Sequence, residues 1–211
     1  MVHRTPFFLP IFYPTLTWRI PTDQNKLFLT FDDGPVPGPT EFVLETLKGH
    51  GLKATFFSIG DNIRKHPEIF RKISEENHVI GNHTFNHLSG WKTKTGAYVD
   101  NVERCKSEME SQLPALTQSQ RKQLFRPPYG RITRRQIAAL QNFKIIMWDV
   151  LSMDYGRMNA DRCLKNTIRA TRPGSIIVFH DSYKAEKNLE YVLPRFVDHF
   201  LSQGFEFNAI Q

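Results

Sequence analysis

The stretch KLFLTFDDGP, residues 26–35, begins with an apolar run typical of a buried β-strand and ends with two adjacent carboxylates and a Gly-Pro pair. Neighbouring side chains on a strand point to opposite faces, so one regular strand does not direct Asp32 and Asp33 at one target. Two interpretations are open at this point. Either both acids lie at a solvated strand end, or the turn at Gly34 and Pro35 directs them to two different tasks.

Six further β-rich runs follow this strand and alternate with amphipathic stretches. The predicted strands cover residues 26–31, 54–58, 78–82, 124–126, 143–150, 175–179 and 205–209. The predicted helices cover residues 40–49, 61–76, 98–112, 133–141, 160–170 and 188–203. This alternation predicts a parallel α/β architecture with right-handed crossovers, either an open sheet or a barrel. In both, catalytic groups gather at the carboxyl ends of the strands, so polar residues there are the candidate functional residues.

The composition is that of one folded domain. Of the 211 residues, 40% are hydrophobic and 12% aromatic, enough for a substantial core. We expect an N-terminal arm, residues 1–25, packed on a single domain, residues 26–211. Lys and Arg number 28 against 21 Asp and Glu, and the pI near 9.5 suits an anionic partner. The basic residues are scattered without a recognition motif, so we expect no nucleic-acid partner.

The N-terminus and the cysteines bear on the cellular compartment. The first residues, MVHRTPFFLPIFYPTLTWRIP, combine positive charge with apolar residues, but Pro10 and Pro14 interrupt the run and no small-residue cleavage site follows. We expect neither a signal peptide nor a transmembrane segment. A cytoplasmic location is therefore expected by default, with cell-envelope association as the alternative. Cys105 and Cys163 are expected to be two buried thiols, with a single disulfide bridge as the alternative.

Ionisable residues follow five of the predicted strands. The set comprises Asp32 and Asp33, His83 and His87, Arg126, Asp149 and Asp154, and His180 and Asp181. Each alone has an ordinary structural explanation, such as a turn or a helix cap. Five unrelated coincidences are needed to explain all of them that way, so we expect one functional rim.

The segment HTFNH, residues 83–87, suggests a metal site on that rim. The i, i+4 spacing of His83 and His87 puts two imidazoles on one face of a helical turn, although this spacing alone is a weak signal. A carboxylate from the Asp32–Asp33 pair completes a set of two histidines and one carboxylate. Such a set leaves coordination positions open for water and substrate, as catalytic metals require.

Five segments together resemble a known family. TFDDGP (30–35), HTFNH (83–87), RPPYG (126–130), WDVLSMDY (148–155) and IIVFHD (176–181) are similar to the ordered motifs of the polysaccharide deacetylases, the NodB-homology group called carbohydrate esterase family 4. The resemblance covers residues 27–181. It implies a distorted, incomplete (β/α) barrel with an open groove, and a metal-dependent hydrolase that removes N-acetyl groups from an amino-sugar glycan, such as the N-acetylglucosamine of peptidoglycan or chitooligosaccharide.

The resemblance also implies the chemical roles around the metal. Asp33, His83 and His87 match the ligands of a divalent metal, usually Zn²⁺, with Co²⁺, Ni²⁺ or Mn²⁺ as alternatives. Asp32 matches the general base, and Arg126 matches the residue that orients this base. The backbone N–H of Tyr129 matches the donor to the oxyanion.

The motifs further imply a general acid and a substrate surface. His180 matches the acid, Asp154 is the carboxylate that raises its pKa, and Asp181 is expected to be a turn residue. Two positions depart from the family pattern: Tyr155 stands where Trp is usual, and Val178 where Leu is usual. Tyr129, Tyr155, Val178 and Trp91 are expected to contact substrate, and Phe85 is a further aromatic residue that could stack on a sugar.

Two other functions remain as alternatives to an N-deacetylase. The same site could hydrolyse O-acetyl esters or other C–N bonds, such as those of cyclic amides. A non-catalytic glycan-binding module is the second alternative, although binding alone needs neither a base nor an acid. A monomer is expected.

Overall fold

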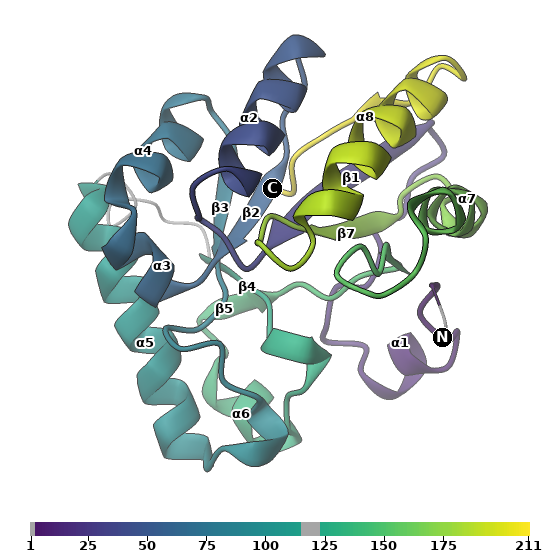
Figure 1. Cartoon of the computed structure of the whole chain (residues 1–211). Coiled ribbons are helices and arrows are strands. Elements are labelled where there is room, and N and C mark those ends of the chain that lie inside the picture. The colour runs from purple at the N-terminus through teal and green to yellow at the C-terminus, as the bar shows by residue number, and fades with distance from the viewer. Residues whose placement is uncertain (1–2, 115–122) are drawn as a thin grey trace.

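The computed structural model describes residues 3–114 and 123–211, which form a curled parallel sheet with helices around it (Figure 1). The strand order is β5-β4-β3-β2-β1-β7-β6, and β8 pairs with the first residues of β1. The strands are Lys26–Asp32 (β1), Thr55–Ser58 (β2), Val79–Asn82 (β3), Gln123–Phe125 (β4), Phe143–Ile145 (β5), Val150–Leu151 (β6), Ile176–His180 (β7) and Glu206–Phe207 (β8). Within the described residues β5 and β6 do not pair, so the barrel is incomplete, which confirms the predicted fold class.

Helices cover the outer face of this sheet, with α2 and α8 side by side over β1 and α3, α4 and α5 beside β2 and β3 (Figure 1). The α-helices are Leu9–Phe12 (α1), Pro39–Gly49 (α2), Gly60–Lys65 (α3), Pro67–Glu75 (α4), Thr95–Gln112 (α5), Arg134–Ala139 (α6), Ala160–Ala170 (α7) and Glu186–Leu201 (α8). Short 3-10 turns occupy Gly90–Lys92 (η1) and Pro128–Gly130 (η3). No helix in the described ranges is both long enough and apolar enough to span a bilayer.

The central strand β1 is buried on both faces. Leu27, Leu29 and Phe31 alternate along it and join the largest hydrophobic cluster, which they share with residues of α2 and α8. Thr30 and Asp32 lie on the other face, toward the barrel interior, where both accept hydrogen bonds from Arg126. This alternation explains the unbroken apolar run: one set of side chains packs under the helices, and the other lines the interior.

The N-terminal arm crosses the gap between β5 and β6. The Thr17 N–H donates to Ile145 O at 3.0 Å, and the Met147 N–H donates to Thr17 O at 2.7 Å. Farther toward the N-terminus, Arg4 forms an antiparallel bridge with Val150. The arm therefore satisfies backbone groups that the open sheet leaves unpaired.

Two elements that were each predicted as one are divided in the structure, so both predictions are wrong in this respect. The predicted strand 143–150 is two strands, β5 and β6, at opposite edges of the sheet, because residues 146–149 cross the open side between them. The predicted helix 61–76 is two helices, α3 and α4, because Pro67 cannot donate a helical hydrogen bond and forces His66 out of helical geometry. Cys105 and Cys163 are free and buried in different clusters, which confirms the expected thiols.

Candidate active site

A cleft of about 410 Å³ opens at the carboxyl ends of the strands, in the size range of small-ligand pockets. Residues from β1, β7 and the segments after β3 and β4 line it, so distant parts of the chain meet there. The lining residues are Asp32, Asp33, His83, His87, Tyr129, Arg131, Trp148, Leu151, Tyr155, Val178, His180 and Lys184.

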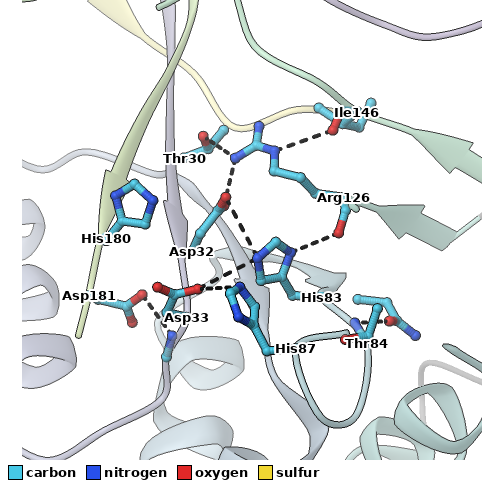
Figure 2. Close-up of polar contacts among 12 residues, drawn as sticks. Thr30, Asp32, Asp33, His83, Thr84, His87, Arg126, Ile146, His180 and Asp181 are labelled. Carbon is cyan, nitrogen blue, oxygen red and sulfur yellow. Dashed lines mark hydrogen bonds and ion pairs between the residues drawn. The ribbon is translucent and has the colours of Figure 1, made fainter. Parts of the chain in front are cut away.

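Three of these residues form a set able to hold a divalent metal. One potential ligand atom from each of Asp33, His83 and His87 lies within 4.8 Å of the others. Asp33 Oδ1 is 3.1 Å from His87 Nε2 and 3.6 Å from His83 Nε2 (Figure 2). The His83 Nδ1–H donates to the backbone oxygen of Arg126 at 2.7 Å, which leaves the Nε2 lone pair directed toward the set. Two imidazole nitrogens and one carboxylate fit a divalent cation with open coordination positions.

The two histidines converge through a turn, and the predicted helical turn at HTFNH is wrong. Thr84 and His87 have φ values of 62° and 54°, in the left-handed region that a helix excludes. Asn82 Oδ1 accepts the Thr84 N–H at 2.9 Å, and Thr84 Oγ1 accepts the Leu88 N–H at 3.1 Å. These side-chain contacts hold the turn, which brings the two imidazole centroids to 5.1 Å from each other.

The geometry of β1 separates the two adjacent acids. Asp32 is the last strand residue and faces the barrel interior, whereas Asp33 has a φ of 85° and turns toward the histidines. The Asn62 side chain donates to Asp33 O at 2.7 Å, and the Gly34 N–H donates to Asp181 Oδ1 at 3.1 Å. A Cβ at position 34 would overlap the Asp181 carboxylate, so this turn requires glycine. Asp181 thus has the turn role expected from the sequence, and burial raises its pKa to about 8.

Asp32 is held by a fully buried arginine. Arg126 Nη1 donates to Asp32 Oδ1 at 2.7 Å and to Thr30 Oγ1 at 2.7 Å, while Nη2 donates to Met147 O at 2.9 Å. The guanidinium also lies 4.1 Å from the centroid of the Phe57 ring. Asp32 Oδ2 remains on the side of the metal set, 4.0 Å from His83 Nε2 (Figure 2). An oriented carboxylate with one free oxygen beside a metal set is suited to accept a proton.

Replacing Arg126 with Met is expected to destabilise the fold by about 3 kcal/mol or more, because Asp32 would remain buried without its counter-charge. Urea denaturation followed by circular dichroism measures this loss. The double variant Arg126→Met/Asp32→Asn serves as the control and should recover part of the stability. An Arg126→Met protein as stable as the wild type would contradict this account of the pair.

His180 and Asp154 form a second buried pair at the end of β7, where His180 lies beside Asp32 of β1 in the strand register. His180 Nδ1 lies 2.8 Å from Asp154 Oδ1, and Asp154 Oδ2 accepts the His180 backbone N–H at 2.8 Å. Burial is the largest single influence and lowers the pKa of His180, but the carboxylate of Asp154, together with those of Asp33 and Asp32, raises this pKa to about 9. The imidazole is therefore protonated at neutral pH and retains Nε2–H as a donor.

Asp154→Asn is expected to lower the pKa of His180, because burial remains while the opposing carboxylate is lost. A reaction that needs protonated His180 then loses rate at lower pH than in the wild type. The alkaline limb of the kcat/KM profile measures this shift. Asp149→Asn is a matched change outside the cleft and should not shift the alkaline limb of the kcat/KM profile. If Asp154→Asn also left this limb at its wild-type pH, the role of Asp154 in raising the pKa of His180 would be contradicted.

Asp149 does not belong to the predicted rim. It precedes β6, and its carboxylate accepts hydrogen bonds from Arg172 and from Ser175 Oγ, which precede β7. It therefore lies at the amino ends of these strands. Phe85 is also not a sugar platform, because it is buried, with the Arg104 guanidinium over its ring.

Sequence reasoning missed four lining residues: Arg131, Trp148, Leu151 and Lys184. Leu151 lies beside Val178 in the β6–β7 register, so it adds apolar surface where Val178 is smaller than the usual Leu. Trp148 is the first residue of the WDVLSMDY motif, so its place in that motif was a signal that it lines the site. Trp91 does not line the cleft; it is 67% exposed, and its ring lies 5.4 Å from the Arg131 guanidinium.

The fold and the site define a class of protein: an α/β half-barrel with one carboxylate and two imidazoles set for a divalent metal at its carboxyl end. Residues 19–148 match the family described as "Polysaccharide deacetylase", and the chain belongs to this family.

Two similar proteins have names that agree with this membership. A peptidoglycan-N-acetylglucosamine deacetylase of Bacillus cereus is 37% identical over 164 residues, which are 77% of this chain and 58% of the relative. This chain thus spans less than two thirds of that protein. A chitooligosaccharide deacetylase of Bradyrhizobium is 32% identical over 178 residues, covering 83% of this chain and 80% of the relative.

A solved structure supports the fold over nearly the whole chain. The crystal structure of a peptidoglycan N-acetylglucosamine deacetylase, in complex with 4-naphthalen-1-yl-N-oxidanyl-benzamide, superimposes with a TM-score of 0.87 at 31% identity. The match covers 98% of this chain and 95% of that one. The curled half-barrel is therefore the fold of this family.

Proposed function

We propose that this protein is a Zn²⁺-dependent N-deacetylase of glycans that contain N-acetylglucosamine. One observation carries the proposal: one cleft holds the metal set, Asp32 oriented by Arg126, and His180 kept protonated by Asp154. Amide hydrolysis needs a base for the attacking water and an acid for the leaving nitrogen. A binding module needs neither.

Asp33, His83 and His87 would hold the ion. Bound Zn²⁺ supplies Lewis-acid polarisation of the acetyl carbonyl and lowers the pKa of a water molecule. Two of the ligands are imidazoles, a type of ligand that suits zinc. The relatives' substrates, peptidoglycan N-acetylglucosamine and chitooligosaccharide, support an amino-sugar substrate for this chain.

The chain's own groups perform the proton transfers. As water attacks the acetyl carbon, Asp32 Oδ2 accepts one of its protons. The backbone N–H of Tyr129, in a turn with φ of 61°, donates to the developing oxyanion, and one such donor is worth about 3 kcal/mol. When the C–N bond breaks, His180 Nε2–H donates to the nitrogen, which leaves as an amine beside acetate. Val178 and Leu151 provide apolar surface for the acetyl methyl group.

A comparison of bond types tests the proposal. Zn²⁺-loaded protein is offered N-acetylglucosamine oligosaccharides, O-acetylated xylan oligosaccharides and a cyclic amide, and the released acid and amine are quantified. Release of equal amounts of acetate and amine from the first substrate is expected to exceed hydrolysis of the other two. The N-deacetylase assignment would be refuted if the protein hydrolysed only the ester or only the cyclic amide. It would also be refuted if protein with one metal ion bound per chain hydrolysed none of the three substrates.

A further inference from the structure

Two tyrosines lie beside histidines of the cleft, and a positively charged side chain lies near the ring of each tyrosine. The Tyr129 ring lies 4.6 Å from the His87 ring, and the Tyr155 ring lies 4.7 Å from the His180 ring. His87 and His180 lie to either side of Asp33 (Figure 2). The tyrosines are therefore aromatic surfaces of the cleft beside these two histidines, placed to meet the faces of bound sugar rings.

Each tyrosine has a basic side chain over its ring. The Arg131 guanidinium carbon lies 5.7 Å from the Tyr129 centroid, and Lys184 Nζ lies 5.1 Å from the Tyr155 centroid. Both basic residues line the cleft, and both are exposed. We call these four residues the two tyrosine–cation pairs.

Neither cation is neutralised by the protein. Arg131 and Lys184 form no ion pair with any carboxylate in the parts of the chain that the structure describes. The two carboxylates that line the cleft are already engaged, Asp32 by Arg126 and Asp33 by the histidines. The cleft walls beyond the metal set therefore carry uncompensated positive charge.

We propose that the two tyrosine–cation pairs select N-acetylated glycans that carry carboxylates on sugars next to the one deacetylated. This inference rests on the proposed function and names its substrate class. A neutral chitooligosaccharide offers no counter-charge to Arg131 or Lys184, whereas a muramic-acid or uronic-acid neighbour does. Charge pairing at the cleft mouth then adds to stacking on the tyrosines.

Binding, measured separately from turnover, tests the proposal. The Zn²⁺-loaded Asp32→Asn protein is titrated with three tetrasaccharides: alternating N-acetylglucosamine and N-acetylmuramic acid, hyaluronan, and chitotetraose. At about 10 mM salt the anionic probes should bind more tightly than chitotetraose, and about 1 M salt should remove most of the difference. Arg131→Gln and Lys184→Gln, introduced into this protein, should each weaken anionic binding about threefold and leave chitotetraose unchanged.

Matched controls lie close by in the chain. Arg135→Gln and Lys187→Gln remove the same charges from exposed positions outside the cleft lining, and neither should change the preference. Whichever of the two anionic probes binds more tightly shows whether the carboxylate comes from muramic acid or from a uronic acid. Equal affinity for all three probes, or an equal loss for chitotetraose in the cleft variants, would overturn the inference. A failure to release acetate overturns the proposed function alone, because this readout is affinity.

Discussion

His87→Ala is expected to weaken Zn²⁺ binding by at least about 100-fold and to abolish detectable deacetylation. The variant removes one of three converging ligands, while the ion contributes several kcal/mol of transition-state stabilisation. A loss of about 4 kcal/mol corresponds to roughly a 10³-fold lower rate. Competition with a chromogenic chelator measures the affinity, and acetate release measures the rate.

The control for this variant is His199→Ala, which removes from α8 a histidine whose imidazole contacts the Gln203 side chain at the surface. It should retain wild-type zinc affinity and rate. His87 is the preferred target because its side chain is 25% exposed, whereas that of buried His83 also supports the backbone of Arg126. Wild-type zinc affinity in His87→Ala would contradict the assigned ligand set.

Asp32→Asn is expected to lower kcat by about 10²- to 10⁴-fold without loss of bound zinc. The amide keeps the size of the carboxylate and can still accept the hydrogen bond from Arg126 Nη1, but it cannot take a proton from water. Substrate binding should change little. Single-turnover kinetics together with metal analysis of the same preparation measure both quantities.

The neighbouring substitution Asp33→Asn makes this prediction specific. Asp33 has left the strand with a φ of 85° and lies 3.1 Å from His87, so its loss should reduce zinc content as well as rate. Asp32→Asn should thus lose rate while it keeps zinc, whereas Asp33→Asn should lose both zinc and rate. Loss of zinc in Asp32→Asn, or full zinc content in Asp33→Asn, would contradict the division of roles between them.

Local patterns were sufficient to predict much of the fold and the chemistry. The apolar run of β1 and the alternation of strands and helices predicted a parallel α/β architecture, and the resemblance of the motif segments to a known family implied the incomplete barrel and the metal set. These features depend on neighbouring residues. The break at Pro67 was also visible in principle, because the residue before a proline is driven out of helical geometry.

Features that depend on distant contacts were not predictable in the same way. The segment 143–150 has strand-like composition, but pairing of Ile146 with Thr17 in the arm separates β5 from β6. The turn in HTFNH depends on Asn82 and on left-handed residues that its spacing does not reveal. Arg131 and Lys184 have ordinary basic side chains in the sequence, and only the folded chain brings them to one cleft.

The dependence of acetate release on zinc tests the central claim most directly. Metal-free protein is titrated with Zn²⁺ in the presence of an N-acetylglucosamine oligosaccharide, and acetate is measured at each addition. The rate should rise in proportion to added zinc and reach a plateau at one ion per chain, with equal amounts of acetate and amine formed. Acetate release that does not depend on metal, or no release with one zinc ion bound per chain, would contradict the account.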